Sequence, residues 1–107
     1  MARHLLQLAV MAVGIASFPI LSPAKADGDP AYGEYLAGQC TACHQKSGKD
    51  KGIPSIVGWH PEAFVIVMNA YKSKEREHKA MQTIASSLGD EEIAALAAYF
   101  AQLKPQD

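Results

Sequence analysis

Two cysteines and a histidine stand close together and are the residues best suited to chemistry. Cys40 and Cys43 are three positions apart, and His44 follows directly. On a helix, positions i, i+3 and i+4 share one face, so the two thiols and the imidazole would point the same way. Such a group could serve as a redox-active dithiol, as half of a zinc site or as the attachment point of a c-type haem.

The surrounding sequence favours the third of these chemistries. A thioredoxin-like dithiol is expected in a βαβ context, and the chain shows no convincing alternating strand. A zinc site would need two further ligands, and the remaining histidines and carboxylates show no paired spacing. Residues 40–44 read C-x-x-C-H, the signature in which two thiols form thioethers with haem and the histidine binds iron. We therefore predict one covalently attached haem c, with Cys40 and Cys43 as thioethers and His44 as the proximal iron ligand.

The amino terminus reads as a secretory signal. A short basic start precedes a largely apolar stretch from Leu5 to Leu21, and Ala24-Lys25-Ala26 has the small residues that a signal peptidase reads. The alternative is an uncleaved membrane anchor, but as a helix the stretch would cover only about 25 Å of a roughly 30 Å hydrocarbon core. We predict that residues 1–26 are a cleaved signal, that residues 27–107 form a single domain in the periplasm, and that no stable membrane insertion follows cleavage.

Composition limits the remaining possibilities. A chain of 107 residues has room for one small domain. Its formal net charge is −1, so bulk charge gives no reason to expect a nucleic-acid partner.

The region after the signal is predicted to be all-α, with three main helices and a short one. The first begins at Asp29-Pro30, a cap followed by a first-turn proline, and runs into the cysteines. The second opens at Pro61, the short one spans about 81–88 and ends at Gly89, and the last begins near Gly89 and is stopped by Pro105. The apolar stripe of the second helix is Phe64, Val67, Met68 and Tyr71, and that of the last is Ile93, Leu96, Ala97, Phe100 and Leu103.

With these features together, the chain from Asp29 to Leu103 resembles a class I monohaem cytochrome c of bacteria. The resemblance rests on the first helix running into Cys40–His44, a later methionine and a last helix ending Ala98-Tyr99-Phe100. Within that class it most resembles the haem subunit of flavocytochrome c sulfide dehydrogenase. The residues that carry this closer likeness are Phe64, Met68, Tyr71, Arg76 and Met81, then Asp90-Glu91-Glu92-Ile93 and Ala97-Ala98-Tyr99-Phe100. The resemblance implies an all-α fold wrapped around a covalent haem.

The second axial ligand has four candidates, Met81, Met68, His78 and His60. The resemblance implies Met81, which lies beyond the middle helix where the family places its ligand methionine. Met68 lies on an apolar stripe and is expected to fill the core. His78 lies in a charged run and is expected to be solvated, and His60 precedes a helix start, where it could be a cap or a surface group. An open distal site would instead point to a haem enzyme or sensor.

Three further residues have predicted supporting roles. Pro54 could accept a hydrogen bond from the His44 ring through its carbonyl, as the family does, or be a simple loop proline. Trp59 could donate its indole N–H to a haem propionate, or only pack. Gly33 is expected to let the first helix approach the last one near Tyr99 or Phe100.

The predicted function is electron transfer by haem iron cycling between Fe(II) and Fe(III), since a six-coordinate iron leaves no position for substrate. By itself the protein would not be an enzyme. The partners are predicted to be redox proteins, among them a flavoprotein if the chain is the sulfide dehydrogenase subunit and serves sulfide oxidation; the alternative is a freely diffusing carrier. Basic residues between the predicted iron ligands would steer acidic partners if they surround the haem edge, or form a solvated face. They are Lys46, Lys49, Lys51, Lys72, Lys74, Arg76 and Lys79.

Overall fold

The computed structural model describes residues 14, 16, 17, 19 and 28–106. The predicted signal, residues 1–26, falls almost entirely outside this part of the chain and stays a prediction. The described residues contain helices and no strands, which confirms the all-α fold. None of these helices has the length and apolar character needed to cross a membrane. The helices are α1 (Pro30–Leu36), α2 (Gly38–Thr41), α3 (Pro61–Lys72), α4 (Lys79–Ser86) and α5 (Asp90–Gln102).

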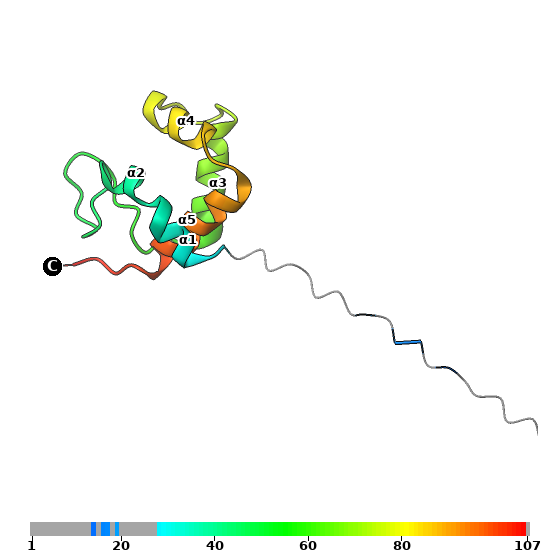
Figure 1. Ribbon diagram of the computed structural model, residues 1–107. Helices are drawn as coiled ribbons and strands as arrows, with labels where there is room; N and C mark the ends of the chain where they lie inside the picture. Colours follow the sequence, from blue (N-terminus) through cyan, green and yellow to red (C-terminus); the bar gives the residue numbers. More distant parts are fainter. Residues whose placement is uncertain (1–13, 15, 18, 20–27, 107) are drawn as a thin grey trace, which may run out of the picture.

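Helix α5 is the centre of the fold. It packs against both α1 and α3, and α3 in turn packs against α4 (Figure 1). The predicted stripe of α5 is buried from Ile93 to Phe100, whereas its last member, Leu103, is half-buried and follows the end of the helix. The Phe100 ring stacks on Phe64 of α3 with centroids 5.9 Å apart. The apolar periodicity of both helices therefore serves a shared core.

The crossing of α1 and α5 depends on Gly33, as expected from the sequence. A Cβ atom at this position would lie 2.0 Å from the carbonyl oxygen of Ala95 and 2.7 Å from the Cβ of Tyr99. No side chain fits that space, because the colliding atoms belong to the backbone and stem of α5 rather than to a movable side-chain tip.

The first helix differs from the prediction because it is interrupted at Ala37. The Ala37 N–H donates to the carbonyl of Glu34, three residues back, which tightens the turn between α1 and α2. Beyond it, the N–H groups of Cys40 and Thr41 both donate to the Ala37 carbonyl. The cysteine pair therefore begins on a short separate helix and not on a continuous one.

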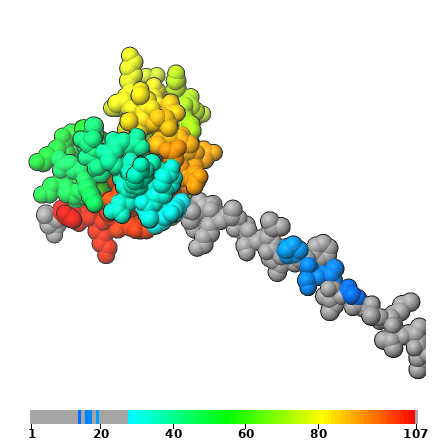
Figure 2. Space-filling model, viewed as in Figure 1, coloured from blue at the N-terminus to red at the C-terminus, as the bar shows by residue number. Residues whose placement is uncertain are grey.

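A long loop joins α2 to α3 and is tied to the carboxyl end of the chain. Gly58 donates its N–H to the Phe100 carbonyl at 2.9 Å, and Gln106 donates to the Ser47 carbonyl at 2.8 Å. Gly58 has a φ of 76°, a left-handed conformation that glycine adopts without strain. These bonds fix a segment that lacks regular structure of its own. The space-filling view shows α1, α2 and this loop forming one face of the folded part, with α4 at its upper end (Figure 2).

Replacing Gly33 by alanine is expected to lower the free energy of unfolding by about 1–3 kcal/mol, because the new methyl group overpacks the α1–α5 contact. Alanine at Gly38 is the matched control, because a Cβ there would meet nothing within 4 Å. Gly38→Ala should be neutral or stabilise by up to about 1 kcal/mol through helix propensity. Denaturant unfolding of the two variants measures the difference, and equal stabilities would contradict the close helix crossing.

Candidate haem site

A largely apolar cavity of about 670 Å³ lies between α2 and α4, two helices that do not contact each other. Its volume falls within the range of small-molecule and cofactor sites. Its walls come from α2, the loop that follows, the stripe of α3 and the first turns of α4. The lining residues that matter for the site are Cys40, Cys43, His44, Pro54, Trp59, Phe64, Met68, Tyr71, Arg76, His78 and Met81.

The two thiols reach the cavity in different environments. Cys40 is buried, Cys43 is exposed, and neither forms a disulfide. Burial raises the pKa of the Cys40 thiol to about 11, so this thiol is neutral at physiological pH. The N–H groups of Cys43 and His44 both donate to the Cys40 carbonyl, which continues the helical turn through the motif. The turn therefore brings both sulfur atoms and the imidazole to one cavity.

The His44 ring is oriented by the loop. Its Nδ1 lies 2.6 Å from the carbonyl oxygen of Pro54, the contact expected from the sequence. A carbonyl can only accept a hydrogen bond, so Nδ1 must be the protonated nitrogen and must donate. The other nitrogen, Nε2, then carries a lone pair for a metal ion.

The four candidates for the second ligand have distinct positions. Met81 lines the cavity from the first turn of α4 and is half-buried. Met68 also lines it, but is 4% exposed and packs in the core cluster. His60 is exposed and does not line the cavity. His78 lines it and is exposed, as the sequence suggested, and its Nδ1 also accepts the N–H of Met81 at 3.3 Å, so it caps α4.

Trp59 lies at the cavity with its indole N–H already bonded to the protein. Its ring lines the cavity, but its indole N–H donates to the carbonyl of Ser55 at 3.0 Å. The donor expected to reach a haem propionate is thus engaged within the loop. The ring also packs against the core cluster, and the hydrogen bond closes the turn from Ser55 to Trp59, while the propionate role stays a prediction.

Sequence reasoning did not predict that two side chains at the cavity contact each other. Arg76 donates its Nε–H to the Tyr71 hydroxyl at 3.0 Å, and its guanidinium lies 5.4 Å from the centre of the Tyr71 ring. Both residues line the cavity. Their spacing of five residues has no helical or strand period, so only the fold of the α3–α4 connection brings them together.

The other two chemistries considered for the cysteines find no support in the described part of the chain. No three His, Cys, Asp or Glu side chains gather there in an arrangement that could hold a metal ion. No βαβ unit frames the cysteine pair, because residues 28–106 contain no strand. A c-type haem needs two thiols for its thioether bonds and axial ligands for its iron, and the two cysteines, the Nε2 of His44 and an apolar cavity wall fit that need.

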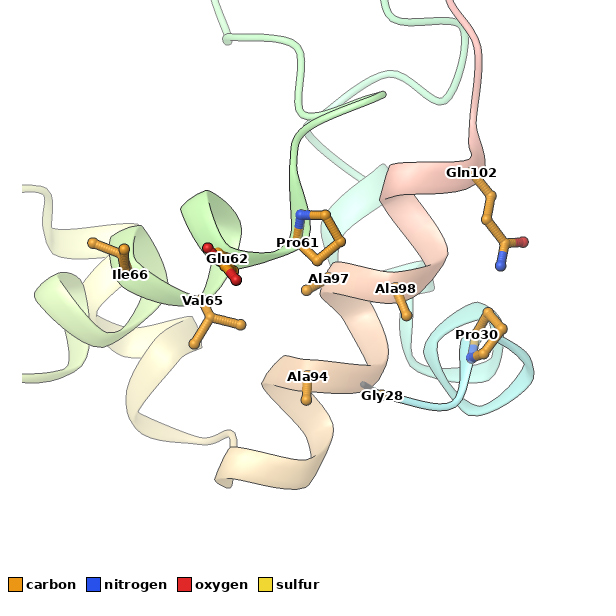
Figure 3. A pocket seen from close by; sticks show the side chains of 10 residues that line it. All are labelled: Gly28, Pro30, Pro61, Glu62, Val65, Ile66, Ala94, Ala97, Ala98 and Gln102. Carbon is orange, nitrogen blue, oxygen red and sulfur yellow. The ribbon is translucent and has the colours of Figure 1, made fainter. Parts of the chain in front are cut away.

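A second apolar hollow lies on another part of the surface. It has a similar volume, about 660 Å³, and is lined by the start of α3, by α5 and by the chain entering α1 (Figure 3). Ile66 on its wall is 68% exposed. The lining contains no cysteine, histidine or methionine, so of these two cavities in the described residues only the first has the chemistry to attach a haem.

The comparisons with known proteins agree with this site. Residues 24–100 match the family described as cytochrome c oxidase, cbb3-type, subunit III. The chain belongs to this family of c-type cytochromes. The c-type cytochromes carry haem c covalently, and Cys40 and Cys43 have the spacing that attachment requires.

Individual relatives of this cytochrome carry different names, one of which states a role. It is 39% identical over 77 residues to cytochrome c4 of Thiocapsa roseopersicina, covering 69% of this chain and 40% of the relative. It is 31% identical over 90 residues to the cytochrome subunit of sulfide dehydrogenase of Chlorobaculum tepidum, covering 83% and 82%. It is 35% identical over 78 residues to cytochrome c-554(548) of Halomonas halodenitrificans, covering 68% and 94%. The cytochrome thus spans about two fifths of the length of its cytochrome c4 relative and most of the length of the other two.

The Trp59 contact can be tested in the assembled cytochrome. Trp59→Phe keeps an aromatic ring at the cavity but removes the bond to Ser55, so the free energy of unfolding should fall by about 1 kcal/mol. The midpoint potential should stay close to that of the parent protein, because no haem carboxylate loses a partner. Thermal unfolding and redox titration measure the two quantities, and an altered potential with unchanged stability would restore the propionate role.

Proposed function

We propose that this cytochrome transfers single electrons in the periplasm, with His44 and Met81 as the two axial ligands of its haem iron. Bound haem c supplies an Fe(II)/Fe(III) couple that gains and loses one electron at a time. The observation that carries the assignment is a single cavity with both thiols and His44 on one wall and Met81 on another. The periplasmic location rests on the predicted signal at residues 1–26.

Each ligand has a defined task in this proposal. The Pro54 carbonyl keeps the His44 Nδ1 proton in place, so that Nε2 faces the cavity. The Met81 thioether completes the coordination and, as a soft ligand, favours Fe(II) and raises the reduction potential. With both positions filled by the chain, no position remains for oxygen or another substrate. The protein alone is therefore a carrier and not an enzyme.

The apolar wall contributes to the same end. Phe64 and Met68 are buried at the cavity, and Ile56 and Ile84 line it as well. A wall of this kind excludes water and keeps the local dielectric low, which disfavours the extra positive charge of the oxidised iron. The surrounding apolar side chains thus raise the reduction potential, as the proposed methionine ligand does.

Ligation is tested by the same substitution at the two cavity methionines. Met81→Leu should abolish the weak sulfur-to-iron charge-transfer band at the red end of the oxidised spectrum and let the reduced protein bind carbon monoxide readily at neutral pH. Met68→Leu is the matched control, because a volume-conserving change in the core should leave the band and cost less than about 1.5 kcal/mol of stability. Loss of the band in the Met68 variant instead would overturn the assignment of Met81.

The finer role we propose is that of a haem subunit in a sulfide dehydrogenase, which passes on electrons received from a flavoprotein. The support is the relative named as the cytochrome subunit of that enzyme, matched over 82% of its length. A free carrier is the second candidate, favoured by the cytochrome c-554(548) relative, matched over 94% of its length under a name that includes no enzyme.

Four of the basic residues support electrostatic steering of an acidic redox partner. Lys46 lies 6.0 Å from the centre of the Tyr99 ring, and Lys72 donates to the Leu88 carbonyl at 2.6 Å, so both have structural contacts. Lys49, Lys51, Lys74 and Lys79 are exposed, and they remain the cations that an acidic redox partner would meet.

The two roles differ in what accompanies the protein when it is purified from its native source. A subunit should co-elute with a flavoprotein at constant stoichiometry through gel filtration, with flavin and haem absorbance in one peak. The complex should persist at high salt if an apolar interface holds it together. Elution as a lone haem protein of the size of residues 27–107 would establish the free carrier instead.

A further inference from the structure

The connection that leads into the predicted distal ligand has little packing to hold it, although α4 itself is anchored by the buried Ala85. Helix α4 packs against α3 and against no other helix of the described chain. Residues 73–80, which lead into Met81, are all exposed. Segments with few buried contacts open locally at low free energy. Met81 packs against the core cluster on one side, and the exposed segment that leads into it needs a further restraint.

Three hydrogen bonds supply that restraint. The Met81 N–H donates to His78 Nδ1 at 3.3 Å, which fixes the first turn of α4. The side-chain amide of Gln82, the residue after the ligand, donates to the Arg76 carbonyl at 3.0 Å. Arg76 in turn donates its Nε–H to the Tyr71 hydroxyl at 3.0 Å. A continuous chain of contacts thus runs from the neighbour of Met81 back to the last turn of α3.

The Tyr71 end of this chain is firmly placed. Tyr71 is half-buried on the same stripe of α3 as Phe64 and Met68, the two residues anchored in the core. The Arg76 N–H also donates to the Ala70 carbonyl at 3.1 Å, so the arginine is tied to α3 by its backbone as well as by its side chain. Lys74 makes the sharp turn between them in a left-handed conformation, with φ of 64°. The connection is thus folded back onto α3 before α4 begins.

We propose that Tyr71, Arg76 and Gln82 form a latch that positions the Met81 sulfur and so sets how firmly it holds the iron. The inference rests on the proposed His44/Met81 ligation. Arg76 is a positioning residue in this arrangement, since it acts on the iron only through the segment that it ties down. Loss of one hydrogen bond of the latch should raise the population with Met81 detached by roughly 2- to 10-fold.

Tyr71→Phe is the sharpest test, because it removes one oxygen atom and keeps the ring and every charge. In the haem-loaded protein, it should increase carbon monoxide binding by the reduced form by roughly 2- to 10-fold and weaken the sulfur-to-iron band. Arg76→Gln should act in the same direction. The double variant should add little to Arg76→Gln alone, because both changes break the same contact.

Two matched controls separate the latch from general effects. Tyr35→Phe makes the same change at a tyrosine that is 83% exposed, and Lys79→Gln removes a cation beside the latch without touching it. Neither should change carbon monoxide binding. If Tyr71→Phe equals its control, or if Lys79→Gln matches Arg76→Gln, the latch is overturned. Met81→Leu measured alongside keeps the two ideas apart: if it leaves the band and carbon monoxide binding unchanged, the ligation itself is wrong.

Discussion

The structure depends on one geometric constraint, which is that a single helical turn cannot supply both sides of a haem. Residues 40–44 place two thiols and an imidazole on one side of the cavity, and in the proposed ligation the second iron ligand comes from elsewhere in the chain. The rest of the domain holds α2 and α4 on two sides of a cavity without letting them touch. The loop that contains Pro54 contributes to the same arrangement, because its hydrogen bond determines which nitrogen of His44 faces the cavity.

Helix α5 supports this arrangement indirectly, through the elements that it packs against. It contributes no residue to the cavity wall, yet it supports α1 through the Gly33 contact and α3 through the Phe64–Phe100 stack. It also receives the Gly58 N–H at the Phe100 carbonyl, and so anchors the loop that orients His44. The buried stripe of α5 therefore supports both segments that carry the predicted ligands. The residues of this stripe are determined by packing in the core and not by the chemistry of the site.

Features encoded by neighbouring residues could be predicted from the sequence. The C-x-x-C-H motif, the proline and glycine boundaries and the apolar stripes are local signals, and α3 and α5 begin where these signals indicate. Contacts made within the connections between helices could not be predicted in the same way. The Arg76–Tyr71 pair, the engagement of the Trp59 indole with Ser55 and the His78 cap each depend on the path of a connection. The interruption at Ala37 was also missed, because a single i−3 hydrogen bond leaves no mark in hydrophobic periodicity.

The attachment of α4 to one neighbour alone has a consequence for how such domains can diversify. Residues 73–80 are all exposed and lie outside the α1–α5–α3 frame, so changes there can alter the proposed hold of Met81 on the iron and leave the core unchanged. Changes within α5 have the opposite effect, because they alter folding and leave the cavity wall chemically the same. Substitutions that tune the reduction potential and substitutions that alter folding stability would thus fall largely in different segments of the chain, so that selection could change one property with little effect on the other.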